Sequence, residues 1–177
     1  MKSLLQYSIP YTGLKLGIHQ FEFDVDDAFF SAFEYSLVKS GKLKVELNLE
    51  KQETMLILHF RISGEMMLGC DVCLADYPYK VEIDERQIAK FTGNVELEED
   101  TEEILVLTKN ENEIDVAPLI YEYINLAVPY INRCGDEGNT KWCDQDMIEK
   151  LKQLSGGPKE DSQHADPRWE ALKNIKK

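Results

Sequence analysis

The chain has 177 residues, 43% of them hydrophobic, and a formal net charge of −13 at pH 7. This size and apolar content suit one globular domain with a single sizeable core. The acidic balance argues against direct, tight binding to RNA, because contacts with a phosphate backbone need clustered Lys and Arg. The sequence has no apolar run of about eighteen residues and no signal-peptide core near its start, so we expect a cytoplasmic protein without a membrane span.

The N-terminal part predicts one strand and one short helix. Residues 14–23 are expected to form the strand, and the helix should begin at the acidic residues 26 and 27, which suit a helix N-terminus. Phenylalanines at positions 29, 30 and 33 of this helix invite two interpretations, a ligand-binding box or part of the core. Aromatic side chains at helical spacing ordinarily bury large apolar area, so we expect core packing.

The middle of the chain predicts an antiparallel meander. Residues 43–50 alternate between apolar and polar side chains, which is typical of a strand with one buried face. Residues 55–62 form a more fully apolar strand, and Gly64 is expected to interrupt it. The alternation returns over residues 77–83, and residues 104–107 add a further strand.

A strongly acidic segment lies between the last two of these strands. Six of the eight residues from 96 to 103 are Asp or Glu. Such a run usually marks a solvated loop, and the functional alternative is a contact for a basic protein.

Two helices are predicted in the C-terminal third. The first begins near Asp115, carries apolar side chains at three-four spacing and ends at Pro129. The second follows Asp144 and ends at the glycines 156 and 157. We expect residues 1–154 to form a single α+β domain, with an antiparallel sheet, open or barrel-like, covered by these C-terminal helices.

The rest of the chain predicts a tail. Residues 155–166 are polar and without pattern, as in a flexible linker. Residues 167–177 predict a short helix with Trp169, Leu172 and Ile175 on one face. A helix this short must dock to be stable, either on its own domain or on a partner.

Four cysteines form two separated pairs, Cys70 with Cys73 and Cys134 with Cys143. The first pair falls in the turn between two predicted strands, and the second falls between the two predicted helices. If the four sulfurs meet, they form a tetrahedral thiolate site of the kind that binds structural zinc and clasps distant parts of a fold. Such a closed set leaves no position for an activated water, so it predicts no hydrolytic catalysis.

Two other interpretations of the cysteines remain open. The four residues are free thiols in the first, since a reducing compartment disfavours disulfides. In the second, Cys70 and Cys73 are the redox pair of a thiol oxidoreductase. That chemistry needs the pair at a helix N-terminus, where a thiol pKa is lowered, whereas this pair interrupts strand-like sequence.

Catalytic motifs are not found elsewhere in the sequence. The chain has no phosphate-binding glycine loop, no nucleophile elbow and no triad, and its three histidines are isolated from one another. We therefore expect no catalytic residues and no enzyme.

Three segments together carry a family resemblance: residues 64–74 with the CxxCL element, the helix of residues 114–129 ending in Ala-Val-Pro, and residues 166–173. They resemble the YceD family of bacterial large-ribosomal-RNA accumulation proteins. The resemblance implies a role in accumulation or processing of 23S ribosomal RNA and in assembly of the large ribosomal subunit. Members of the family commonly carry Arg inside the CxxC turn, where this chain has Asp71 and Val72.

The acidic composition and the resemblance together predict a protein adaptor. Its partners would be ribosome-assembly or RNA-processing proteins, including basic ones, which an acidic surface attracts. The alternatives are a direct RNA-binding or RNA-processing protein and the thiol oxidoreductase above.

Overall fold

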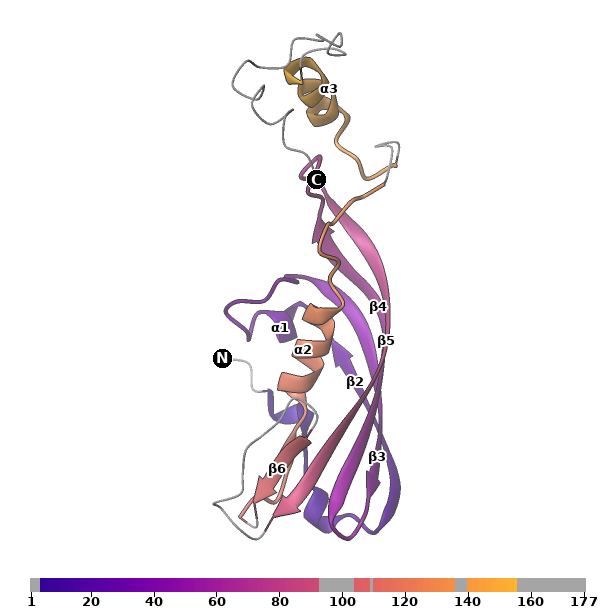
Figure 1. Ribbon diagram of the computed structural model, residues 1–177, viewed down its shortest axis with the longest axis vertical. Coiled ribbons are helices and arrows are strands. Elements are labelled where there is room, and N and C mark those ends of the chain that lie inside the picture. Colours follow the sequence, from indigo (N-terminus) through magenta and orange to yellow (C-terminus); the bar gives the residue numbers. More distant parts are fainter. Residues whose placement is uncertain (1–3, 93–103, 109, 136–139, 156–177) are drawn as a thin grey trace, which may run out of the picture.

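A computed structural model describes residues 4–92, 104–108, 110–135 and 140–155. The molecule is elongated, and one twisted sheet runs along most of its length (Figure 1). The predicted acidic loop at 96–103, most of the predicted linker and the predicted helix at 167–177 lie outside the described residues. No helix in the described ranges has the length and apolar content needed to cross a membrane.

The main sheet has five strands in the order β2-β3-β4-β5-β6, and a smaller sheet pairs β1 with β7. The strands are β1 (Ser8–Ile9), β2 (Gly17–Val25), β3 (Gly41–Lys51), β4 (Met55–Gly69), β5 (Asp76–Thr92), β6 (Ile104–Thr108) and β7 (Ile114–Asp115). The helices are α1 (Asp27–Phe30), α2 (Ala117–Leu126) and α3 (Gln145–Leu154), with two 3-10 helices at Leu4–Tyr7 and Tyr11–Gly13. Each strand and helix predicted within the described part of the chain is present, with shifted ends.

The alternation in β3 places one set of side chains in the core. Leu43, Val45, Leu47 and Leu49 are buried, and the polar residues between them are exposed. β4 and β5 are longer than predicted, with 15 and 17 residues. Their pairing continues to Gly69 and Asp76, past the last pair of β3 with β4 at Gly41 and Met66. The β4–β5 hairpin therefore extends beyond the rest of the sheet.

Gly64 does not interrupt β4, contrary to the prediction. It pairs with Leu43 of β3 and with Val81 of β5. Its φ is +150°, and a Cβ atom built on it would lie 2.3 Å from the carbonyl oxygen of Lys42. The strand remains continuous because glycine alone allows this backbone angle and this close approach of β3.

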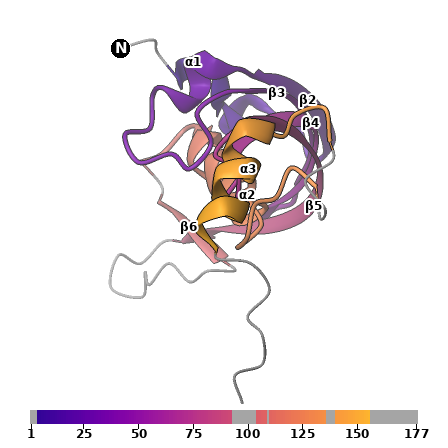
Figure 2. The ribbon, with the colours of Figure 1, turned by 90° about the horizontal axis from the view of Figure 1, so that it is seen from above.

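The sheet curves around α2 when it is viewed along the long axis (Figure 2). Ile120 and Ile124 of α2 are fully buried in the core that this helix shares with the sheet. The Tyr121 ring stacks on Phe33, with ring centroids 4.0 Å apart. Asn125 holds the segment after α1, because its Oδ1 accepts a 3.0 Å hydrogen bond from the Leu37 amide.

The structure confirms that the aromatic cluster near α1 belongs to the core. Phe29 and Phe30 are buried, and Phe33 packs against them from the side. Asp26 caps α1, since its Oδ1 accepts hydrogen bonds from the amides of Ala28 and Phe29 at 2.9 and 3.1 Å.

Three parts of the predicted architecture need correction. The sheet is not a closed barrel: β2 and β6 are its edges, and α2 covers the face that a barrel would enclose. The sheet is also not wholly antiparallel, because β6 pairs with β5 in parallel. Finally, of the two helices predicted in the C-terminal third, α2 alone packs into the core of the sheet. α3 lies beyond the end of the β4–β5 hairpin and has no buried residue (Figure 1).

Candidate metal centre

Cys70 and Cys73 lie in the turn that joins β4 to β5, as predicted. The turn is closed by hydrogen bonds from the Cys70 amide to the Ala75 carbonyl and from the Leu74 amide to the Cys70 carbonyl, both of 2.9 Å. Leu74 has a φ of +63°, in the left-handed region. This conformation lets the chain reverse directly after Cys73 and enter β5 at Asp76.

The second pair of cysteines lies between α2 and α3, also as predicted, and two hydrogen bonds fix this connection to the turn. The Asp71 amide donates to the Asn132 carbonyl at 2.8 Å, and the Asn132 amide donates to Oδ2 of Asp71 at 2.7 Å. Asp71 therefore has a structural role in this turn. Asp71 brings Cys134 to the first pair.

Three sulfurs form a tight group. The Sγ atoms of Cys70, Cys73 and Cys134 all lie within 4.8 Å of one another, and those of Cys73 and Cys134 are 3.6 Å apart. Zn–S bonds of about 2.3 Å in a tetrahedron give sulfur–sulfur distances of about 3.8 Å, so this spacing fits a common ion. The fourth predicted ligand, Cys143, is not in this group of three, although its thiol lies near enough to those of Cys73 and Cys134 to influence its pKa.

Backbone amides stabilise a negative charge on Cys70. Burial alone would raise the pKa of this thiol, but the amides of Cys73, Cys134 and Val72 donate to its sulfur and lower the pKa to about 6. Two of these N–H···S contacts are 3.4 Å, from Val72, and 3.5 Å, from Cys134. Amides directed at a sulfur are the arrangement expected around a metal-bound thiolate.

The thiols of Cys134 and Cys143 resist ionisation when no cation is present. Burial, together with the neighbouring thiols of Cys73, Cys70 and Cys143, raises the pKa of Cys134 to about 12. Burial and the hydrogen bond with Cys73 raise the pKa of Cys143. Cys70 ionises readily, whereas ionisation of Cys134 and Cys143 would add unfavourable negative charge to a buried site. A divalent cation bound between the sulfurs would remove this cost.

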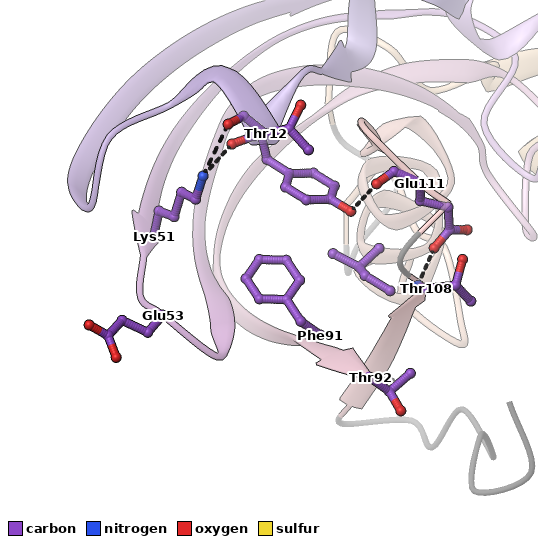
Figure 3. Close-up of a pocket in the computed structure, with 9 residues that line it drawn as sticks. Thr12, Lys51, Glu53, Phe91, Thr92, Thr108 and Glu111 are labelled. Atoms are coloured by element: carbon purple, nitrogen blue, oxygen red, sulfur yellow. Dashed lines mark hydrogen bonds between the residues drawn. The ribbon is translucent and has the colours of Figure 1, made fainter. Parts of the chain in front are cut away.

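The structure also contains a pocket that the sequence did not predict, where the 3-10 helix at Tyr11–Gly13 meets the ends of β5 and β6 (Figure 3). It has a volume of about 340 Å³, and nine residues line it: Tyr11, Thr12, Lys51, Glu53, Phe91, Thr92, Leu107, Thr108 and Glu111. Its polar groups serve the fold. The Lys51 ammonium donates to the carbonyls of Tyr11 and Leu14 at 2.8 and 2.9 Å, and the Tyr11 hydroxyl donates to the Glu111 carbonyl at 2.7 Å. No sequence motif marks these segments, which meet only in the folded chain.

The fold and the cysteine cluster define the class of protein: a small α+β protein with one helix packed on an open, mostly antiparallel sheet and a candidate metal centre at the end of its longest hairpin. The model of one protein family, described as "Large ribosomal RNA subunit accumulation protein YceD", matches residues 58–176, which include all four cysteines. The chain therefore belongs to the YceD family, as the sequence resemblance indicated.

The chain is also similar to a curated bacterial protein. The chain is 28% identical to "Uncharacterized protein YlbN" of Bacillus subtilis (strain 168) over 119 residues, which are 66% of this chain and 67% of the relative. No solved structure matches the chain.

Proposed function

We propose that this chain is a non-enzymatic factor that supports the accumulation and processing of 23S ribosomal RNA during assembly of the large ribosomal subunit. It acts as an acidic protein adaptor, and a structural zinc ion joins its β4–β5 hairpin to the connection between α2 and α3. Family membership supports the role in ribosomal RNA metabolism. The cluster of Cys70, Cys73 and Cys134 is the observation that supports the metal.

Zinc fits this cluster by the chemistry of its donors. Cys70, Cys73, Cys134 and Cys143 would hold the ion, as thiolates do in structural zinc sites. Bound there, zinc would supply a cross-link between segments about sixty residues apart in sequence and no catalytic chemistry, because four thiolates fill its coordination. The amide groups that point to the Cys70 sulfur add hydrogen bonds that favour the bound thiolate.

One observation favours a rival function. A Cys70 pKa of about 6 is also typical of the attacking thiol in a disulfide oxidoreductase. Burial argues against that function, since Cys70 and Cys73 are only 3% and 1% exposed and a substrate disulfide must reach the sulfur. The turn also joins two strands rather than a strand and a helix.

The net charge supports a protein partner rather than a phosphate backbone. At −13 the molecule repels nucleic acid and attracts basic proteins, which raises the rate of encounter with them. Ribosomal proteins, RNA-processing enzymes and assembly factors with basic surfaces are the partners that fit.

The metal is tested on the purified full-length chain. We expect about one zinc ion per chain by elemental analysis, as one four-thiolate site requires. Replacement Cys73→Ser should remove most of the zinc, and Ser36→Ala, which changes a buried residue outside the cluster, should not. A metal-free native protein that does not take up zinc would refute the metal centre.

The adaptor role is tested in cells that lack the gene. We expect a lower ratio of 23S to 16S ribosomal RNA, restored by the wild-type chain and not by Cys73→Ser. Proteins that co-purify with the wild-type chain should remain bound after nuclease digestion. Loss of every bound protein on digestion, together with a salt-sensitive shift of purified ribosomal RNA, would instead establish direct RNA binding.

A further inference from the structure

Two sulfurs from distant segments are in contact within the cysteine cluster. The Sγ atoms of Cys73 and Cys134 are 3.6 Å apart, although the two residues are 61 positions apart in sequence. A disulfide has a sulfur–sulfur distance of about 2.05 Å, so the two atoms would have to approach by roughly 1.6 Å. Rotation of the two side chains can supply a displacement of this size. The contact is therefore a candidate site for a disulfide between the β4–β5 turn and the connection from α2 to α3.

Hydrogen bonds hold the backbone on both sides of this contact. Asp71 lies two residues before Cys73, and Asn132 lies two residues before Cys134. The two exchange hydrogen bonds of 2.8 and 2.7 Å that involve no sulfur atom. These bonds would keep the segments aligned whether the thiols are reduced, bound to a metal or oxidised.

Cys70 is less suited to a disulfide than Cys73. Its sulfur accepts contacts of 3.4 and 3.5 Å from the amides of Val72 and Cys134. Such contacts are strongest when the sulfur carries a negative charge, which a disulfide removes. A bond between Cys70 and Cys73 would also close only the turn, without joining it to a second segment.

Burial restricts the oxidant that can reach these sulfurs. Cys73 is 1% exposed, and Cys134 is half-buried. A protein disulfide is too large to approach the buried sulfur, which is the argument already made against an oxidoreductase. Hydrogen peroxide is little larger than a water molecule, and it needs to reach only Cys134.

We infer that Cys73 and Cys134 form a reversible disulfide when the chain meets a hydroperoxide, and that this bond releases the metal ion while it keeps the two segments joined. The bond removes two of the four sulfur donors, and the two that remain do not complete a structural zinc site. The inference rests on the proposed metal centre and names its regulation.

The step balances with hydrogen peroxide as the oxidant. The Cys134 thiolate attacks one oxygen of the peroxide, the O–O bond breaks, and hydroxide leaves a sulfenic acid on Cys134. The Cys73 thiolate then attacks this sulfur, the S–S bond forms, the S–O bond breaks, and a second hydroxide leaves. The two sulfurs together lose two electrons, and the peroxide gains them.

The experiment treats the full-length, zinc-loaded chain with hydrogen peroxide and maps its thiols. A chromogenic chelator measures the released zinc, and an alkylating reagent then blocks the remaining thiols. Trypsin separates the cysteines, because it yields peptide 62–80 with Cys70 and Cys73, peptide 134–141 with Cys134 and peptide 142–150 with Cys143. Mass spectrometry identifies the linked peptides, and fragmentation assigns the bond within peptide 62–80.

We expect loss of the bound zinc together with one new bond, between peptides 62–80 and 134–141 at Cys73. Cys70 and Cys143 should carry the alkyl group. Dithiothreitol followed by zinc should remove the link and restore the original zinc content. This reversal separates a disulfide from a sulfinic acid, which dithiothreitol does not reduce.

Two variants serve as a matched pair. Cys143→Ser should still give the link between peptides 62–80 and 134–141, and Cys134→Ser should lose it without a new link to peptide 142–150. The assignment in the wild-type chain decides the question even where a variant fails to fold.

Every other outcome overturns the inference: a main bond between Cys70 and Cys73, a main bond to Cys143, a bond between two chains on a non-reducing gel, a sulfinic acid at Cys134, or zinc retained with all four thiols free. The metal centre itself fails in a different way. A chain that takes up no zinc before peroxide is added refutes the centre, whereas a zinc-loaded chain that does not form the bond refutes only its regulation.

Discussion

At the scale of single residues, protonation decides how the cysteine cluster behaves. Cys70 ionises near pH 6, whereas the pKa values of Cys134 and Cys143 are raised by burial and by the neighbouring thiols. At pH 7 the latter two thiols hold their protons. Any metal ion bound by all four sulfurs must displace them.

The first prediction concerns the pH dependence of zinc binding. Protons compete with zinc for Cys134 and Cys143, so lowering the pH weakens binding. At least two protons are displaced, so we expect the affinity to fall by about a hundredfold or more per pH unit near neutrality. Competition with a chelating dye measures the zinc affinity from about pH 6.5 to 8, where Cys70 is mostly ionised.

The Cys143→Ser variant is the matched control, because it removes one of the protonated ligands. Its affinity should be lower, and its slope against pH should be smaller by about one proton. A wild-type affinity that does not change over this range would contradict the assignment of protonated thiols.

At the scale of elements, Gly64 sets the path of the long hairpin. β4 passes so close to β3 at this residue that the position of a Cβ atom is occupied by the Lys42 carbonyl. The pairing on both sides of Gly64 carries β4 on to the turn that holds Cys70 and Cys73. The cluster is therefore positioned by a glycine well outside it.

The second prediction is that Gly64→Ala lowers the free energy of unfolding by about 3 kcal/mol, because β3 must move and the backbone angle is strained. Gly69→Ala, in the same strand, is the control: the nearest atom to its Cβ would be Oδ1 of Asp76 at 3.7 Å, an ordinary contact. Urea unfolding measures both. Equal effects of the two substitutions would refute the role given to Gly64.

At the scale of the whole molecule, the main core and the cysteine cluster lie at different places along the sheet. The fully buried side chains of β3, β4 and α2 pack in the body of the sheet. The cluster holds the end of the hairpin against the connection that leads to α3, a helix with no buried residue. The zinc site should thus control the tip without being required for the core.

The third prediction follows from this separation. Removal of zinc with a chelator should increase hydrogen exchange in residues 70–75, 130–135 and 140–155 and leave β3 and α2 protected. Hydrogen exchange with mass spectrometry before and after chelation measures the change. Cys134→Ser should reproduce it without the chelator. Exchange of the whole sheet on chelation would mean that the ion is needed for the entire fold.

Much of this fold follows from short-range signals in the sequence. The alternation of residues 43–50 is enough to place β3, and Asp26 is enough to begin α1, because strand pattern and helix capping depend on residues a few positions apart. Local signals also predict half of the cysteine cluster. A CxxC pair between two strand patterns predicts a turn that carries both thiols, and the structure has Cys70 and Cys73 in the turn between β4 and β5.

The rest depended on residues distant in sequence. The parallel pairing of β6, the packing of α2 but not α3 on the curved sheet and the close approach at Gly64 are properties of the assembled sheet, where no local pattern records the neighbour. The pocket at Tyr11 and Lys51 forms in the same way.

The sequence by itself determined which residues are available for a metal site and which elements carry them. Only the tertiary structure decided that Cys134 reaches the first pair, through the hydrogen bonds between Asp71 and Asn132, 61 residues apart. It also decided that the side chains around the cluster remain exposed. The physical reason is that contacts between distant segments depend on how the whole chain packs, whereas turns, caps and alternation depend on adjacent residues.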